Sequence, residues 1–153
     1  MRRFAVFKKF FIRASRMHDI GLTWQGAARS LRHACFITAI GIAVITLVGY
    51  LFGFAPAGIT TAWLLFYIII SVPIQEIIFR GIIQRYLHRY GARRAIAVAS
   101  IAYAAIHFYN PLLVVLTLIA GIAWGSSFHR TGTLIGPIVS HAILGAVLFA
   151  FVV

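Results

Sequence analysis

The 153-residue chain is 62% hydrophobic and only 10% charged, and its mean hydropathy is +0.98. A water-soluble globular domain of this length does not tolerate that composition, so we expect an integral membrane protein whose main partner is the lipid bilayer. The formal net charge of +12 does not indicate nucleic-acid binding, because the basic residues form no stripe and lie before residue 33 or in short gaps between apolar segments.

The N-terminal segment, residues 1–33, is basic, and we expect it at the cytoplasmic membrane surface. Phe4, Phe7 and Phe11 recur at helical spacing among lysines and arginines. This pattern predicts an interfacial amphipathic helix over residues 4–16. The alternative is a disordered basic tail whose charge only marks the cytoplasmic side.

Residues 34–153 are predicted to form an all-α, polytopic transmembrane bundle of about five spanning helices. The apolar segments cover residues 34–54, 61–84, 95–109, 111–128 and 134–153. Most of them reach the ~20 residues that are needed to cross ~30 Å of hydrocarbon. The third segment is short, and Asn110 followed by Pro111 predicts a tight turn after it, because the residue before a proline is disfavoured in helical geometry.

The basic residues predict one orientation of this multi-pass bundle in a bacterial-type cell membrane. With a cytoplasmic N-terminus, thirteen of the fourteen lysines and arginines lie in cytoplasmic segments. Residues 55–60 and the turn at Asn110 carry none, so the positive-inside rule is satisfied throughout. The C-terminus should then face outward.

Polar residues interrupt the second apolar segment at Gln75, Glu76 and Arg80. An ionised group at the centre of a spanning helix costs about 2.5–3.5 kcal/mol on insertion scales, so these residues need an explanation. Glu76 and Arg80 are four residues apart and can pair on one helix face. Pro73 disrupts the helix beside them, which favours a watered cavity. The alternative is an ion pair that only fixes helix register.

Two histidines, His107 and His141, also lie within apolar segments. Counted along ideal helices, Glu76, His107 and His141 lie about 14–20 Å from the nearest cytoplasmic arginine. This common depth predicts that the three side chains converge at one site within the bundle. For either histidine alone, an interhelical hydrogen bond explains the position equally well.

Some recurring residues are interpreted as packing residues. Small residues at four-residue spacing, which allow close helix contact within the chain, are Gly49 with Gly53 and Gly121 with Gly125. The tryptophans interpreted as interfacial or packing aromatics are Trp24, Trp63 and Trp124.

The polar residues resemble the motifs of the CPBP (Abi, or CAAX-protease-like) intramembrane proteases. The segment Pro73-Ile-Gln-Glu-Ile-Ile-Phe-Arg-Gly81 is similar to the family's Glu-Glu-x-x-x-Arg-Gly motif, and Tyr103-x-x-x-His107 is similar to its Phe-x-x-x-His. Gly121 through His141, including Arg130-Thr-Gly-Thr-Leu, resembles the third and fourth motifs. The resemblance covers about residues 60–150, and four ordered motifs are more specific than any one of them.

The resemblance implies an intramembrane endopeptidase in which an activated water attacks a peptide bond of a membrane-associated or lipidated peptide or protein. By position, Glu76 matches the second motif glutamate and Arg80 the motif arginine. His107 and His141 match the first and second motif histidines. In the family, the first glutamate and first histidine are thought to activate the water, while the second histidine and an asparagine stabilise the oxyanion.

The chain departs from the family motifs at two positions. Gln75 stands where the water-activating glutamate would be, and a glutamine amide cannot act as a general base at neutral pH. Gly145 stands where the asparagine would be, which removes a potential oxyanion donor. Three outcomes follow: Glu76 replaces the base, His107 is itself the base, or the site binds without cutting.

Further alternatives concern the class of protein and a cofactor. The chain could be a non-catalytic membrane binding or scaffold protein that retains the CPBP fold. A proton-coupled or small-solute carrier would also use intramembrane Glu and His, although no inverted repeat supports it. A divalent metal such as zinc is a further possibility, because Glu76, His107 and His141 make a plausible three-ligand set. Their spacing in the sequence does not enforce that set.

Overall fold

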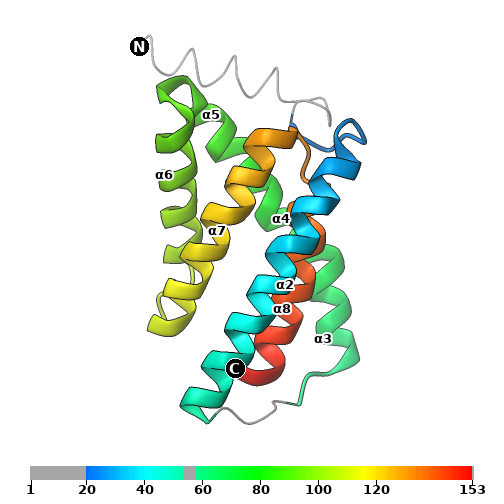
Figure 1. Cartoon of the computed structure of the whole chain (residues 1–153), viewed down its shortest axis with the longest axis vertical. Coiled ribbons are helices and arrows are strands. Elements are labelled where there is room, and N and C mark those ends of the chain that lie inside the picture. Colours follow the sequence, from blue (N-terminus) through cyan, green and yellow to red (C-terminus); the bar gives the residue numbers. More distant parts are fainter. Residues whose placement is uncertain (1–19, 54–57, 153) are drawn as a thin grey trace.

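The computed structural model describes residues 20–53 and 58–152, which form a bundle of α-helices joined by short connections (Figure 1). The prediction of an all-α helical membrane bundle is confirmed. The amphipathic helix predicted over residues 4–16 lies outside the described residues.

Five helical rods make up the described part of the bundle. Four of them are α2 (Ala27–Phe52), α6 (Ala92–Ala105), α7 (Pro111–Thr131) and α8 (Ile135–Val152). The fifth is a continuous rod over Thr61–Tyr90. Its segments are α3 (Thr61–Phe66), η2 (Tyr67–Ser71), α4 (Val72–Glu76), η3 (Ile77–Gln84), α5 (Arg85–Leu87) and η4 (His88–Tyr90). Segments η2 and η3 are π-helical, and η4 is a 3₁₀ turn.

Three rods are long and apolar enough to cross a membrane: α2, the Thr61–Tyr90 rod and α7. The remaining two are shorter, because α6 has 14 residues and the apolar part of α8 covers Ile135–Ala150. A complete crossing by α6 and α8 therefore stays a prediction.

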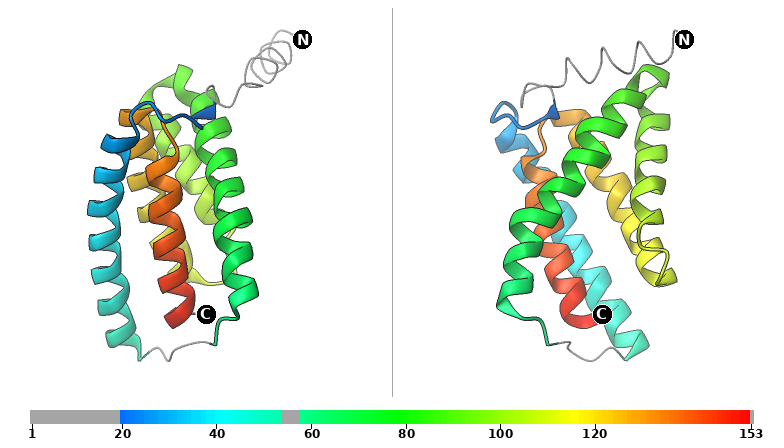
Figure 2. Two further views of the ribbon diagram at one scale, coloured as in Figure 1. Left: turned by 90° about the vertical axis from the view of Figure 1, so that its right-hand side faces the viewer. Right: turned by 180° about the vertical axis from the view of Figure 1, so that it is seen from behind.

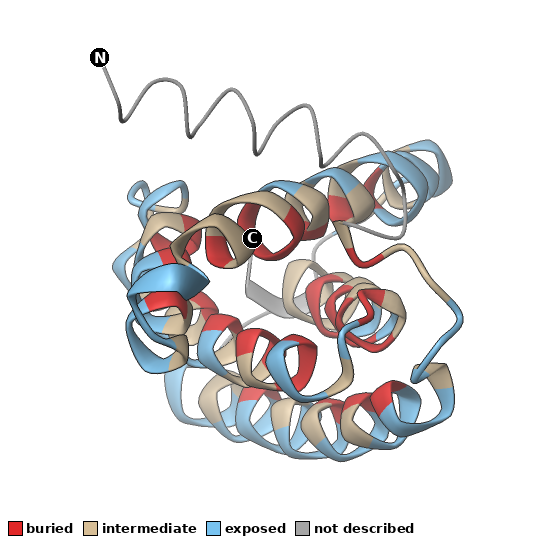
Figure 3. Ribbon diagram, turned by 90° about the horizontal axis from the view of Figure 1, so that it is seen from above, coloured by how far each residue is buried: buried red, intermediate tan, exposed pale blue. Residues whose placement is uncertain are grey.

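The rods pack as two pairs with the long rod laid across them. Helix α2 runs along α8, and α6 runs along α7 (Figure 1). The long rod lies diagonally behind both pairs, so that α4 contacts α8 while η3 contacts α6 and α7 (Figure 2). Buried residues face the middle of this arrangement and exposed ones face outward (Figure 3). The long rod is thus the element that can join the two pairs at one site.

Pro73 changes the winding of the long rod without ending it. A proline has no backbone N–H to donate within the helix, and the wider π-helical segments η2 and η3 flank the turn that contains it. π-Helical segments occur frequently at functional sites. The irregular backbone predicted beside Glu76 is therefore present as a change of helical pitch.

Arginines gather at one end of the bundle. Apart from Arg80, every arginine that the structure describes lies near the end where α2 and α6 begin and α7 ends (Figure 1). These residues are Arg29, Arg32, Arg85, Arg89, Arg93, Arg94 and Arg130. The segregation agrees with the positive-inside pattern, while the cytoplasmic assignment of this end stays a prediction.

The turn predicted at Asn110 is present and starts α7. The Asn110 side chain accepts hydrogen bonds from the backbone N–H groups of Leu112 (3.0 Å) and Leu113 (3.3 Å), with Pro111 in the first turn of the helix. This is a favourable helix start, because the asparagine satisfies two N–H groups and proline at the first position lacks one.

Glycine and small polar residues allow close approach of the rods. Gly121 lies against Ser100 of α6, and Gly125 lies against Gln84 of the long rod, which donates from Nε2 to the Gly125 carbonyl (2.8 Å). The predicted packing role of the second glycine pair is confirmed. The prediction is wrong for Gly53, which ends α2 with φ 67°, where an added Cβ would meet no atom of the described residues within 4 Å.

The α2–α8 contact is closer than the two glycine contacts of α7. A Cβ on Gly136 would overlap the backbone and hydroxyl oxygens of Ser30, and the Gly136 N–H donates to that hydroxyl (3.0 Å). Further along the same pair, Thr38 donates to the Ser140 hydroxyl (2.9 Å). The position of α8, which carries His141, therefore depends on small residues facing α2.

We expect Gly136→Ala to destabilise the bundle by about 1–3 kcal/mol, because the added methyl group forces α2 and α8 apart. Thermal unfolding in detergent measures the loss. Gly58→Ala is the matched control, since a Cβ there meets no atom within 4 Å in the part of the chain that the structure describes. Equal melting temperatures for the two variants would contradict this account of the α2–α8 contact.

Candidate active site

Two buried charges lie one turn apart on the long rod. Glu76 is the last residue of α4, Arg80 lies in η3, and both side chains have no exposed surface. Arg80 Nε lies 3.5 Å from Glu76 Oε2, so the predicted (i, i+4) ion pair is present. Two opposite charges removed from solvent together are far less costly than either alone.

The guanidinium of Arg80 is enclosed by rings and by a helix backbone. Its carbon lies 4.7 Å from the centroid of the Tyr103 ring and 5.8 Å from that of Trp124, which are cation–π distances. Arg80 Nη2 donates to the carbonyl of Gly121 (3.4 Å). Arg80 therefore ties the long rod to α6 and α7 at the level of Glu76.

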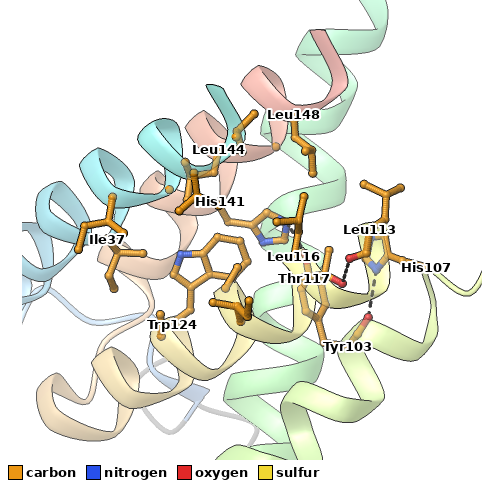
Figure 4. Close-up of a pocket in the computed structure, with 18 of the residues that line it drawn as sticks. Ile37, Tyr103, His107, Leu113, Leu116, Thr117, Trp124, His141, Leu144 and Leu148 are labelled. Carbon is orange, nitrogen blue, oxygen red and sulfur yellow. Dashed lines mark hydrogen bonds between the residues drawn. The ribbon is translucent and has the colours of Figure 1, made fainter. Parts of the chain in front are cut away.

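His141 of α8 is held at both ring nitrogens. Its Nδ1 lies 2.8 Å from Glu76 Oε1 and its Nε2 lies 3.0 Å from the Tyr103 hydroxyl. A carboxylate only accepts, so Nδ1–H donates to Glu76, and Nε2 of the neutral ring then accepts from the phenol. The Trp124 indole stacks on the imidazole with centroids 4.4 Å apart, and its N–H donates to Ser140 (3.0 Å) (Figure 4). The orientation of the His141 ring is therefore tightly constrained.

His107 lies beyond the end of α6, where the sequence predicts helix. The helix ends at Ala105, and the His107 backbone N–H donates to Ala104 O (3.0 Å), three residues back. The Tyr103 carbonyl loses its usual backbone partner in this turn, and His107 Nδ1 donates to it instead (3.1 Å; Figure 4). A carbonyl only accepts, so His107 Nδ1 carries the proton and Nε2 of the neutral ring has a free lone pair.

Tyr103 connects the two histidines. Its hydroxyl reaches His141 and its carbonyl holds His107, while its ring lies 5.2 Å from the His107 ring, centroid to centroid. Glu76, His141, Tyr103 and His107 thus form one continuous chain of contacts. Convergence of Glu76 and His141 is direct, whereas His107 joins them through Tyr103.

Gln75 lines a cavity together with His107 and His141 and forms its hydrogen bond within its own rod. Its Nε2 donates to the Ser71 hydroxyl (2.8 Å), one turn earlier on the rod. Its buried Oε1 has no hydrogen-bond partner among residues 20–53 and 58–152. That oxygen is an acceptor available to a molecule in the neighbouring cavity.

Two cavities meet at the histidines. The first, which we call the apolar cavity, has a volume of about 290 Å³ and lies between α2, α7 and α8 (Figure 4). The second, the polar cavity, has a volume of about 200 Å³ and is lined partly by Ser71 and Gln75 of the long rod. The residues common to both linings are Tyr67, His107, His141 and Phe149. A reactant in either cavity therefore lies beside His107.

Most donor atoms of the predicted metal set already have partners. Glu76 Oε1 and both ring nitrogens of His141 are hydrogen-bonded, while Glu76 Oε2 makes no hydrogen bond within residues 20–53 and 58–152 and lies 3.5 Å from Arg80 Nε. The described residues contain no group of three His, Cys, Asp or Glu side chains arranged for a metal. The side chains as arranged do not fit zinc, which takes three protein ligands in its catalytic sites.

Sequence reasoning misses three contributions to the site. The sequence pattern places Trp124 among packing aromatics, but its indole stacks on His141, and the Tyr103 hydroxyl occupies the second nitrogen of the same imidazole. No motif singles out Tyr67, yet this residue lines both cavities. A hydroxyl-bearing aromatic deep in an apolar span is the signal that could identify it, because a buried phenol usually needs a partner.

A comparison with family models gives a match over residues 56–147, more than half of the chain, to the model described as type II CAAX prenyl endopeptidase Rce1-like. Comparison with curated proteins and with solved structures gives no match.

We expect Glu76→Ala to lower the free energy of unfolding by about 3–5 kcal/mol, because it leaves the Arg80 charge buried without a counter-ion. The double variant Glu76→Leu with Arg80→Leu should recover a large part of that loss. Thermal unfolding in detergent measures both, with Ile74→Ala, on the exposed face of the same helix, as control. If the double variant loses as much free energy of unfolding as its two single variants lose together, the two charges do not depend on each other.

Proposed function

The chain belongs to the type II CAAX prenyl endopeptidase Rce1-like family, and on that premise we propose that it is an active intramembrane endopeptidase. Its substrates are membrane-associated or lipidated peptides, and water is the nucleophile. The observation that carries the proposal is His107, whose Nδ1 proton is held by a backbone carbonyl while its residue lines both cavities.

His107 is the general base in this proposal. Glu76 is not suited to that role, because it is fully buried, lines neither cavity and has one oxygen bonded to His141 and the other beside the Arg80 guanidinium. An imidazole with one nitrogen fixed as a donor presents the other as a proton acceptor, and imidazoles titrate near neutral pH when unperturbed. His107 therefore takes over the task that the missing motif glutamate would perform.

Gln75 positions the attacking water. Its Oε1 borders the polar cavity and has no partner among the described residues, so it accepts a hydrogen bond from the water. The second water proton passes to His107 Nε2 as the water oxygen attacks the carbonyl carbon of the peptide bond. The proton then moves from Nε2 to the amine nitrogen as the carbon–nitrogen bond breaks, which returns His107 to its starting state.

Glu76, Arg80 and His141 act as positioning residues. The Glu76 carboxylate holds His141, and His141 accepts from the Tyr103 hydroxyl, so the Tyr103 ring and carbonyl keep one orientation. The His107 ring is anchored to that carbonyl. A general base displaced by about 1 Å can lose two orders of magnitude in rate, which explains the value of a rigid chain behind it.

The apolar cavity receives the hydrophobic part of the substrate. Its wall is formed by residues such as Ile37, Leu116 and Leu148, and it ends at Tyr103, His107 and His141 (Figure 4). An apolar side chain or a lipid attached to the peptide would bury its surface there, at about 25 cal/mol per Å². The scissile bond would then lie at the boundary with the polar cavity, where the water is held.

A non-catalytic scaffold is the second candidate function, and Gln75 is the observation that favours it. In that case the same cavities bind a membrane-associated peptide without cutting it.

We expect His107→Ala to lower the turnover rate about 10²–10⁴-fold, because the base is removed. The assay uses purified protein in nanodiscs and quenched fluorescent peptides, one with a farnesyl group and one without. His88→Ala is the control, since His88 is exposed and lines neither cavity, and its ring contacts that of His129. Retention of the full rate by His107→Ala would refute the assignment of the base.

Gln75→Glu separates the two candidate functions. If the chain is an active protease with His107 as base, this variant changes the rate little compared with the wild type. If the wild type does not cleave and the Gln75→Glu variant does, the result supports the non-catalytic scaffold function. The same peptides and nanodiscs measure both proteins.

A further inference from the structure

Gly145 lies one turn after His141 on α8, where the resemblance places an asparagine. A Cβ at position 145 would overlap the hydroxyl oxygen of Tyr67, and the three atoms nearest to it all belong to that phenol. The tyrosine therefore occupies the space into which a longer side chain at position 145 would extend. Gly145 is not a simple deletion of a polar group, because another polar group fills its place.

Tyr67 is fixed where its hydroxyl meets the histidines. It is the first residue of η2 and its side chain is buried, with 6% of the residue exposed. The ring stacks on Trp63 (centroids 5.2 Å apart) and meets the edges of Phe149 (5.4 Å) and His141 (6.1 Å). Three aromatic contacts from two rods hold one ring orientation.

The hydroxyl of Tyr67 has no hydrogen-bond partner within residues 20–53 and 58–152, although the residue lines both cavities. His141 and Gly145 are one turn apart and share a face of α8, so the hydroxyl lies about 5–6 Å along the helix from the His141 position. A phenol O–H is a hydrogen-bond donor, and this one lies beside Gly145 on a residue that lines both cavities.

The geometry points to Tyr67 as the oxyanion donor of this enzyme, in place of the asparagine that Gly145 excludes. The assignment rests on the proposed endopeptidase activity. As water adds to the peptide carbonyl, the carbonyl oxygen becomes an alkoxide, and the Tyr67 O–H donates a hydrogen bond to it without transferring its proton. When the carbon–nitrogen bond breaks, the carbonyl re-forms and the hydrogen bond weakens.

The two side chains would compete for one place. An asparagine at 145 would need the volume that the Tyr67 hydroxyl occupies, so it would have to displace the phenol. The chain keeps one donor at this place with a different side chain from a different helix. His141 is less available for the task, because its Nε2 already accepts from Tyr103.

Tyr67→Phe is the direct test, because it removes the hydroxyl and keeps the ring packing. We expect kcat to fall about 10²–10³-fold with KM and the melting temperature unchanged, since the lost hydrogen bond exists only in the transition state. Tyr50→Phe is the matched control, as Tyr50 is exposed near the end of α2. If the wild type cleaves the peptide and the Tyr67→Phe variant cleaves it at the same rate, the assignment of Tyr67 is overturned. The protease proposal then remains intact.

Exchange of the donor gives a second test. Gly145→Asn alone should lower the melting temperature and the rate, because its side chain meets the Tyr67 phenol. In the Tyr67→Ala background the same substitution should raise the rate at least about tenfold, since an amide donor then replaces the phenol in vacated space. No gain in that background would argue against a shared site for the two donors.

A binding measurement does not depend on turnover. A peptide phosphinate carries a non-cleavable tetrahedral anion, and the Tyr67→Phe protein should bind it about 10²-fold more weakly than the wild type does, with unchanged affinity for the product peptide. Equal phosphinate affinities would overturn the assignment even if no cleavage were found. A third outcome is that the wild type cleaves neither peptide while the Tyr67→Phe variant binds the phosphinate more weakly than the wild type does. That result would refute the protease proposal and support the anion-binding role of the hydroxyl.

Discussion

The ion pair of Glu76 and Arg80 is the constraint on which the rest of the site depends. Both groups are fully buried in a helix that crosses the membrane, where an unpaired charge is strongly unfavourable. Each must therefore meet compensating partners from other helices. Arg80 finds aromatic faces and a carbonyl on α6 and α7, and Glu76 finds His141 on α8. The requirement for charge compensation thus brings four helices to one level.

Tyr103 connects the ion pair to His107, which we propose as the general base. The Tyr103 hydroxyl donates to His141, and its carbonyl holds His107 at the end of α6. The site lies between an apolar cavity and a polar cavity, so an apolar substrate and a water can approach the same imidazole from different directions. In the mechanism that we propose, the buried charges provide rigidity, and the neutral groups beside them perform the chemistry.

Much of this arrangement follows from local sequence patterns. Apolar segment lengths predict the membrane helices, Asn110 before Pro111 predicts the turn, and four-residue spacing predicts the ion pair. Other features depend on tertiary contacts that no short pattern carries. The end of α6 before His107 is set by a backbone turn inside an apolar run, and no local pattern distinguishes Trp124 from a packing residue. From the sequence alone Gly145 is a lost donor, because Tyr67, 78 positions away, becomes its neighbour only in the folded chain.

The decisive measurement is the protonation state of His107. Nitrogen-15 NMR of histidine-labelled protein in nanodiscs at neutral pH distinguishes a protonated from a bare ring nitrogen, and His107→Gln identifies the signals. We predict that His107 carries a proton on Nδ1, as the bond to the Tyr103 carbonyl requires, and has a bare Nε2, as its role as the base requires. A His107 ring with its proton on Nε2 would contradict its role as the base, because that nitrogen could not accept a proton from water.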